Sequence, residues 1–236
     1  MAISGTLNLP GDKSISHRAL MLASLVNGRS ELRNLSSADD VVSTISCLKS
    51  CGLKYDRTSN SVIVNGGNFV DPDQPLDCGN SGTTMRLLLG LLSGQGINAT
   101  LIGDDSLSKR PMKRIINPLK QMGLKIISND YKSPIKIQKS KLNGISYHSP
   151  IASAQIKSSL LFSGLGAAGT TMITEPILSR NHSEIMLSNL GAKIKTNDLS
   201  ISISKSNNFS LDLPGPIKLI ATKKRIAIEK LFEIDF

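Results

Sequence analysis

Pro10-Gly-Asp-Lys-Ser-Ile-Ser-His-Arg18 leads directly into an apolar run, Ala19 to Val26. The Pro-Gly pair interrupts extended structure, the Asp or Ser that follows can cap a helix, and the apolar run has helical length and spacing. Lys13, Ser14 and Arg18 are therefore expected at a helix N-terminus or one turn inside it. Free backbone N–H groups and the helix dipole favour an anion there, so the expected ligand is a phosphate or carboxylate. The alternative is an ordinary capped helix with a solvated Lys and Arg.

The same plan occurs three times with a period of about 70 residues. Each copy begins with a hydroxyl or small residue, has a cation about one turn later and runs through aliphatic residues to a Gly. The copies are residues 14–28, 81–94 and 153–166, with the cations Arg18, Arg86 and Lys157. A second predicted helix follows each copy and ends at a Gly, as helices commonly do. These second helices are residues 38–51, 111–122 and 182–190.

Short alternating or β-branched runs lie between the predicted helices and indicate strands. Examples are residues 61–64, 100–102, 125–127, 135–137, 170–173 and 201–203. Each repeat then has the order βαβαββ, and three of them form a quasi-threefold α/β (α+β) domain. The first helix of each unit is mostly aliphatic, so we expect these helices inside, with their N-termini toward one face.

The repeat also predicts how the chain is divided. Residues 1–12 are expected to form a strand or hinge segment, and residues 13–215 the domain. Its three units should span about 13–80, 81–150 and 151–215. Residues 216–236 are rich in Ile and Lys and fit no fourth unit, so they are interpreted as an aberrant tail.

Charge and composition narrow the class of ligand. Lys and Arg number 28 against 18 Asp and Glu, which gives a formal net charge of +10. Such an excess suits nucleic acid, an anionic membrane or a small multiply charged substrate. Because the basic residues are scattered, aromatic residues make up 3% and Trp is absent, base stacking is disfavoured. A small anion is the favoured ligand, with no nucleic acid or membrane partner.

Neither a metal nor a membrane is suggested by the remaining patterns. Cys47, Cys51 and Cys78 lack metal-ligand spacing and are interpreted as small buried hydrophobic residues, so no metal is expected. No stretch resembles a signal peptide, and the longest apolar run, Leu87 to Leu92, is too short to span a bilayer. The sequence therefore predicts a soluble cytoplasmic protein.

Five motifs in one order carry a family resemblance. They are Gly11-Asp-Lys-Ser-Ile-Ser-His-Arg18, Asp77-Cys-Gly-Asn-Ser-Gly-Thr-Thr-Met-Arg86, Gly103-Asp-Asp-Ser-Leu-Ser-Lys-Arg-Pro-Met112, Pro150-Ile-Ala-Ser-Ala-Gln-Ile-Lys-Ser158 and Ser179-Arg-Asn-His-Ser-Glu184. Together they resemble the 5-enolpyruvylshikimate-3-phosphate synthases of the enolpyruvyl transferase family, over about residues 3–215. The resemblance implies a protein of two domains, each with three βαβαββ units, of which this chain holds the N-terminal one.

The resemblance also implies roles for the residues of the first three motifs. Lys13 would contact both substrates, shikimate 3-phosphate and phosphoenolpyruvate, and would act catalytically by stabilising charge or moving a proton. Ser14 and Arg18 would hold shikimate 3-phosphate. Gly82 and Arg110 would lie against the phosphate and carboxylate of phosphoenolpyruvate.

Further roles follow from the last two motifs. Ser153 would bind the phosphate of shikimate 3-phosphate, Gln155 would touch both ligands, and Ser179, with Arg180 as a weaker candidate, would close the shikimate site. Arg86 and Ala154 are also weaker candidates. A structural pairing is the alternative for Arg86, and Ala154 stands where some family members have a second Ser. His17 and His182 are interpreted as hydrogen-bonding members of their segments.

The implied reaction transfers the enolpyruvyl group of phosphoenolpyruvate to the 5-hydroxyl of shikimate 3-phosphate and releases phosphate. It belongs to the shikimate pathway to chorismate and the aromatic amino acids, and it requires no metal or organic cofactor. The match ends near Pro214-Gly215, before the second domain, which in the family carries the proton-transfer carboxylates. We therefore expect the chain to be inactive alone and interpret residues 216–236 as the product of a frameshift or truncation.

Two alternative functions remain open at this stage. The first is a monomeric half-enzyme that holds shikimate 3-phosphate weakly without catalysis, or that regains activity when it is paired with a separate C-terminal half. The second is a UDP-N-acetylglucosamine enolpyruvyl transferase. Lys13-Ser-Ile-Ser-His-Arg18 argues against the second, because those enzymes usually open with a Gly-Ala-Lys-Asn type of segment.

Overall fold

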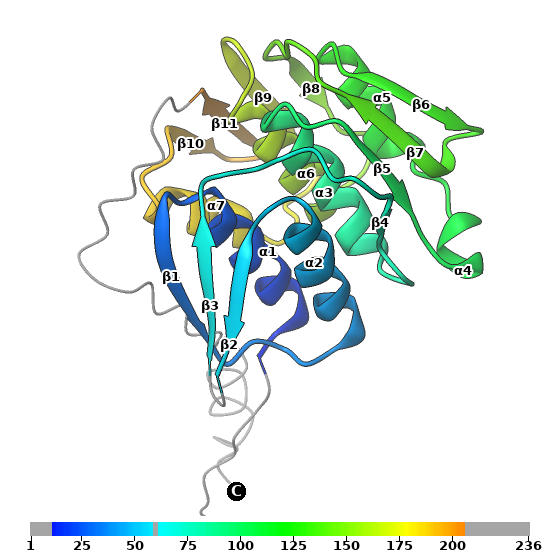
Figure 1. Cartoon of the computed structure of the whole chain (residues 1–236). Helices are drawn as coiled ribbons and strands as arrows, with labels where there is room; N and C mark the ends of the chain where they lie inside the picture. Colours follow the sequence, from blue (N-terminus) through cyan, green and yellow to red (C-terminus); the bar gives the residue numbers. More distant parts are fainter. Residues whose placement is uncertain (1–10, 59–60, 206–236) are drawn as a thin grey trace, which may run out of the picture.

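A computed structural model describes residues 11–58 and 61–205 of the 236-residue chain. The extended segment expected within residues 1–12 and the tail at 216–236 lie outside the described residues, apart from Gly11 and Asp12. The described elements fall into three successive units (Figure 1).

The three units repeat one order of elements. The first contains α1 (Lys13–Leu25), β1 (Gly28–Arg33), α2 (Asp39–Ser50), β2 (Lys54–Arg57) and β3 (Ser61–Gly66). The second contains β4 (Leu76–Asp77), α3 (Gly82–Gly94), β5 (Ala99–Ile102), α4 (Asp105–Ser108), α5 (Lys113–Gln121), β6 (Lys125–Asn129) and β7 (Lys132–Gln138). The third contains β8 (Ser146–His148), α6 (Ala154–Gly164), β9 (Thr170–Thr174), α7 (His182–Asn189), β10 (Ile194–Asn197) and β11 (Ser200–Ser204).

Each unit contributes one sheet, and the sheets share a strand order. The second unit forms the sheet β4-β5-β7-β6 and the third forms β8-β9-β11-β10. In both sheets the first pair is parallel and the other pairs are antiparallel. The first unit forms β1-β3-β2, which matches the last three positions of the other two sheets. The mixed sheets confirm the fold class predicted from the repeat.

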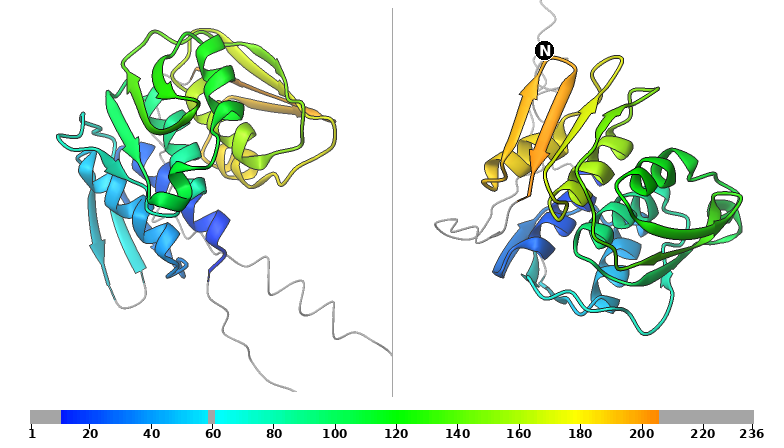
Figure 2. Two further views of the ribbon diagram at one scale, coloured as in Figure 1. Left: turned by 90° about the vertical axis from the view of Figure 1, so that its right-hand side faces the viewer. Right: turned by 90° about the horizontal axis from the view of Figure 1, so that it is seen from above.

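The helices α1, α3 and α6 form the centre, with the sheets around them (Figures 1 and 2). Every residue of α1 from Ser16 to Leu25 is buried, and α3 and α6 are buried along almost their whole length. These are the three helices that were predicted to lie inside because their residues are mostly aliphatic. Their apolar side chains join one continuous core with the inner faces of the sheets.

The backbones of α3 and α6 lie unusually close to each other. A Cβ built on Gly90 would stand 2.1 Å from the carbonyl oxygen of Ser159, and one on Gly94 would stand 2.4 Å from that of Phe162. Contacts this short do not occur between real atoms, so these positions admit only Gly. The missing side chains allow α6 to lie directly along α3, which fixes the relative position of their N-terminal turns.

Substitution Gly90→Ala should therefore destabilise the chain, because the new methyl group collides with backbone that cannot move cheaply. We expect a loss of about 2–3 kcal/mol in the free energy of unfolding, measured with urea. Gly191→Ala is the matched control: its Cβ would meet nothing within 4 Å, and only its φ of +77° is unfavourable. That variant should lose about 1 kcal/mol. Equal losses in the two variants would contradict the close packing.

Candidate functional site

The N-terminal turns of α1, α3 and α6 each have a side-chain cap. Asp12 accepts a hydrogen bond from the backbone N–H of Ile15, and Ser81 and Ser153 cap their helices in the same way. No acidic residue occupies the first turn of any of these three helices. The capping carboxylate of Asp12 offsets part of the positive charge at the start of α1, whereas α3 and α6 are capped by neutral hydroxyl groups. The first turns of α3 and α6 therefore suit an anionic ligand better than that of α1.

Lys13 and Ser14 stand at the start of α1, as the sequence predicted. The ammonium of Lys13 lies 2.8 Å from Oδ2 of Asp40, and both side chains are partly exposed. The hydroxyl of Ser14 accepts a hydrogen bond of 3.1 Å from Arg180, which reaches across from the loop before α7. Three cationic or hydroxyl groups predicted for the site are thus brought together from distant parts of the chain.

Arg18 lies beneath these turns and is only 3% exposed. Its guanidinium donates to Ser183 Oγ (2.8 Å), Ser158 Oγ (2.8 Å) and the carbonyl oxygens of Ser14 (2.9 Å) and Ala154 (3.2 Å). Burial, followed by the nearby Arg180, lowers the pKa of Arg18 to about 10, so it stays charged at neutral pH. These bonds use four of its five N–H groups and tie α1 to α6 and α7.

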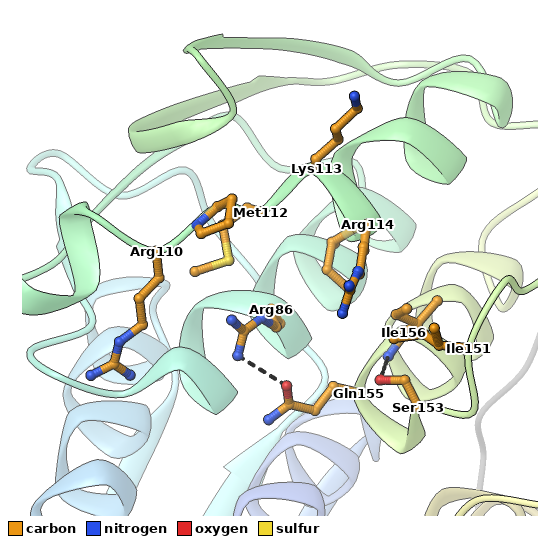
Figure 3. A pocket seen from close by; sticks show the side chains of 11 residues that line it. Arg86, Arg110, Met112, Lys113, Arg114, Ile151, Ser153, Gln155 and Ile156 are labelled. Carbon is orange, nitrogen blue, oxygen red and sulfur yellow. Dashed lines mark hydrogen bonds between the residues drawn. The ribbon is translucent and has the colours of Figure 1, made fainter.

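The starts of α3 and α6 meet through a short chain of hydrogen bonds. Arg86 donates to Gln155 Oε1 at 3.0 Å (Figure 3). The amide nitrogen of Gln155, Nε2, in turn donates to Thr83 Oγ1 at 3.0 Å. Gly82 lies against these groups, because a Cβ at this position would stand 2.7 Å from Nη1 of Arg86. Gly82 is buried, and its missing side chain leaves room for the guanidinium of Arg86 directly against the backbone.

Arg110 points toward the other side of Gly82. Its guanidinium donates to Asn80 Oδ1 at 2.6 Å, to the Asn80 carbonyl at 3.3 Å and to Ser106 Oγ at 3.0 Å. The short helix α4 places Ser106 there, and Asn80 belongs to the turn before α3. Arg110 is partly exposed, so its contacts orient it without enclosing it.

A cavity of about 560 Å³ opens between the starts of α3, α5 and α6 (Figure 3). Its lining residues are Arg86, Arg110, Pro111, Met112, Lys113, Arg114, Ile115, Ile151, Ser153, Gln155 and Ile156. Four of them are cations and none is acidic. Burial lowers the pKa of Arg86, and the neighbouring charges of Arg110 and Arg114 add to this effect. The cavity is therefore electrostatically suited to a small anion.

Ser153 and Ser179 are joined by a residue that sequence reasoning missed. Glu175 accepts hydrogen bonds from the N–H of Ser153 (2.9 Å) and from the hydroxyl of Ser179 (2.9 Å). Asp40, the partner of Lys13, was missed as well. Neither acidic residue belongs to a quoted motif, and each meets its partner only through the tertiary fold. Ala154 contributes its backbone carbonyl, which accepts from Arg18 and from Ser158.

Comparisons with known proteins agree with this geometry. The family model for EPSP synthase (3-phosphoshikimate 1-carboxyvinyltransferase) matches residues 1–212. The chain belongs to the EPSP synthase family. A 3-phosphoshikimate 1-carboxyvinyltransferase of Bacillus pumilus is 43% identical over 93% of this chain and 53% of its own length. One from Synechocystis is 49% identical over 86% of this chain and 47% of its own length.

The fold agrees with that of a solved family member. The structure of EPSP synthase from Acinetobacter baumannii superposes with a TM-score of 0.83 at 37% identity. The superposition covers 86% of this chain and 47% of the Acinetobacter chain. The chain thus spans about half the length of the EPSP synthases that it matches.

Metal sites and membrane-spanning helices are the two other features considered for the described residues. Within residues 11–58 and 61–205, no group of three or more His, Cys, Asp or Glu side chains is placed to hold a metal ion. In the same part of the chain, no helix combines the length and apolar character needed to cross a membrane.

His17 is a buried, neutral side chain between α1 and α2. Its Nδ1 lies 2.7 Å from the hydroxyl of Thr44, which in turn lies 2.8 Å from that of Thr84. The pKa of His17 is lowered to about 4, mainly by burial and in smaller part by the charges of Arg18 and Lys13, while Asp40 opposes this effect. The sequence interpretation of His17 as a hydrogen-bonding residue agrees with these contacts.

The low pKa predicts a pH-dependent stability. In the unfolded chain His17 is protonated below pH 6.5, whereas in the folded chain it becomes protonated only below about pH 4. Stability from this group is therefore present above pH 6.5 and is lost as the pH falls toward 4, by about 3 kcal/mol. Urea unfolding at several pH values should show a shallower loss in His17→Asn, which keeps a donor for Thr44. Identical pH profiles would contradict a neutral, buried His17.

Proposed function

We propose that this chain forms one wall of the site where the enolpyruvyl group of phosphoenolpyruvate is transferred to the 5-hydroxyl of shikimate 3-phosphate. The observation that carries the proposal is the meeting of the α1, α3 and α6 N-termini, with cations on both sides. Two phosphorylated acids need several cations in one place, and helix N-termini add backbone donors. Membership of the EPSP synthase family supports these substrates.

Shikimate 3-phosphate is assigned to the side formed by α1, α6 and the loop before α7. Its contacts are the proposed ligands Lys13, Ser14, Arg18, Ser153, Ser179 and Arg180. Arg180 and Ser14 are already hydrogen-bonded, and Arg18 fixes their supporting helices from below. The ligand would therefore meet a surface whose geometry is largely formed beforehand, which reduces the entropy cost of binding.

Phosphoenolpyruvate is assigned to the side formed by the starts of α3 and α5. Gly82 allows a close approach to the backbone, and Arg110 and Arg86 flank that point. A guanidinium suits both the carboxylate and the phosphate of this substrate, since it can donate two parallel hydrogen bonds. Gln155 joins the two sides through Arg86 and Thr83, so it is placed to touch both substrates.

The proposed chemistry begins with addition of the 5-hydroxyl oxygen to C2 of phosphoenolpyruvate, in which the hydroxyl group loses its proton and C3 gains one. The C2–O bond to phosphate then breaks, C3 loses a proton and inorganic phosphate leaves. Lys13 is assigned to stabilising charge or moving a proton, because its partly exposed ammonium belongs to the first residue of α1. Its partner Asp40 is partly exposed, so the ion pair opens at small cost.

The remaining catalytic groups are proposed to come from a second domain. The relatives are about twice as long as the matched region, and one wall cannot exclude water or surround two substrates. The chain would then act in the cytoplasm as a monomer that pairs with a C-terminal half. The alternative is a half-enzyme that binds shikimate 3-phosphate without catalysis.

Binding of shikimate 3-phosphate tests the proposal directly. We expect the purified chain to bind it with a dissociation constant of about 1 mM, since only part of the site is present. Lys13→Met should weaken binding about tenfold by removing one charged contact. Lys195→Met, on the exposed strand β10, is the matched control and should bind as the native chain does. Ligand-observed NMR measures all three, and absence of binding at 10 mM, about ten times that constant, would refute the proposed site.

Complementation separates the catalytic from the non-catalytic form of the proposal. Mixing the chain with a separately expressed C-terminal half of the Bacillus pumilus relative should restore phosphate release from the two substrates. Arg110→Met should reduce that restored rate at least about tenfold, because one guanidinium contact to phosphoenolpyruvate is lost. Binding of shikimate 3-phosphate without any restored release would favour the non-catalytic half-enzyme.

A further inference from the structure

A buried cluster of three charged side chains lies directly behind the proposed shikimate 3-phosphate side. Lys157 of α6 is 3% exposed, Glu175 after β9 is 3% exposed and Glu184 of α7 is 8% exposed. The ammonium of Lys157 lies 2.6 Å from a carboxylate oxygen of each glutamate. Groups of this kind are rarely buried, so the cluster calls for an explanation beyond ordinary packing.

Both carboxylate oxygens of Glu175 accept from the proposed ligand-binding segments. Oε1 accepts from the backbone N–H of Ser153 at 2.9 Å. Oε2 accepts from the hydroxyl of Ser179 at 2.9 Å and from its N–H at 3.4 Å, as well as from Lys157. All of these partners donate hydrogen bonds, so the side chain at position 175 must offer two oxygen atoms that accept them. An ionised carboxylate meets that demand and an amide does not.

The charge on Glu175 is maintained by its neighbours. Burial raises the pKa of Glu175, but the hydrogen bonds from Lys157, Ser179 and Ser153 outweigh burial and bring the pKa below its usual value. The ionised form is therefore the one present at neutral pH. Lys157 also offsets part of the negative charge of Glu175 and Glu184, which would otherwise repel a phosphate bound at Ser153 more strongly.

The threefold repeat offers an internal comparison. Each unit carries a cation in the first two turns of its first helix, but not at the same position. Arg18, Arg86 and Lys157 follow the capping residues Asp12, Ser81 and Ser153 by six, five and four residues. Arg86 lines the cavity and bonds an amide oxygen, whereas Lys157 faces two carboxylates. Because its charge is already balanced, Lys157 is not suited to holding a substrate anion. In the third unit the cation, Lys157, instead forms an ion pair with Glu175.

We propose that Glu175 is a positioning residue, held by Lys157, that ties Ser153 to the loop of Ser179 and so fixes the Ser153 hydroxyl for recognition of the phosphate of shikimate 3-phosphate. This inference rests on the proposed function. The hydroxyl oxygen of Ser153 accepts from the N–H of Ile156, which leaves its hydrogen to be donated outward. Glu175 holds the backbone of the same residue, so the hydroxyl meets the ligand in one orientation. A phosphate, which only accepts, is the matching group.

Amide hydrogen exchange tests the positioning without any ligand. In Glu175→Gln, the amide nitrogen of Gln opposes a donor, so the N–H groups of Ser153 and Ser179 should exchange at least about tenfold faster. Buried amides of α3, such as that of Leu88, should keep their native rates. Glu31→Gln is the matched control, a carboxylate paired with Arg33 on β1, and should change neither serine. Unchanged exchange at both serines in Glu175→Gln would overturn the proposal.

Ligand selectivity tests the purpose of the positioning. NMR titration should compare shikimate 3-phosphate with shikimate, which lacks the phosphate. Glu175→Gln should weaken binding of shikimate 3-phosphate about tenfold or more and that of shikimate less than about threefold. Glu175→Asp keeps the charge but is one methylene shorter, so its loss should be intermediate. A purely structural role would weaken both ligands equally, and that result would overturn the proposal.

The two tests also distinguish failure of the inference from failure of the proposed function. If the native chain binds neither ligand, or binds both equally, the assignment of the phosphate site is refuted. The exchange measurement still decides whether Glu175 holds the two serines. If the native chain prefers shikimate 3-phosphate and Glu175→Gln keeps that preference, the proposed function stands and the positioning role is refuted.

Discussion

The close approach of α3 and α6 is the constraint on which the proposed site depends. Gly90 and Gly94 remove the side chains that would separate the two backbones. The first turns of both helices therefore meet, and the side chain of Arg86 on α3 donates a hydrogen bond directly to Gln155 on α6. A site built on packed helices keeps its geometry because the core is dense and resists deformation.

The three repeats share a plan, and the site arises where they differ from one another. Each unit places a cation one turn inside its first helix, but the surroundings decide what that cation does. Arg18 joins three helices through buried hydrogen bonds, Arg86 lines a cavity, and Lys157 pairs with two carboxylates. The repeat therefore gives a symmetric framework, and the surroundings of each cation set how far its charge is already neutralised.

Much of the fold was predictable because local signals recur. Caps, aliphatic runs and terminal glycines located the helices, and α1, α3 and α6 begin within one residue of the predicted starts. The helix predicted from residue 111 begins at Lys113, and the four-residue α4 before it was not predicted, because so short a helix leaves no periodic pattern. In the site, the partners Asp40 and Glu175 were not predictable, since only tertiary packing brings them to Lys13 and Ser153.

The ion pair between Lys13 and Asp40 has a consequence for the unliganded chain. Both side chains are partly exposed, so the pair contributes at most about 1 kcal/mol. Without Asp40, a long and flexible ammonium at the edge of a cationic surface would be repelled away from it. The carboxylate keeps the ammonium close to the start of α1. In the proposed site, an arriving anion would replace this carboxylate and would not have to order a freely moving side chain.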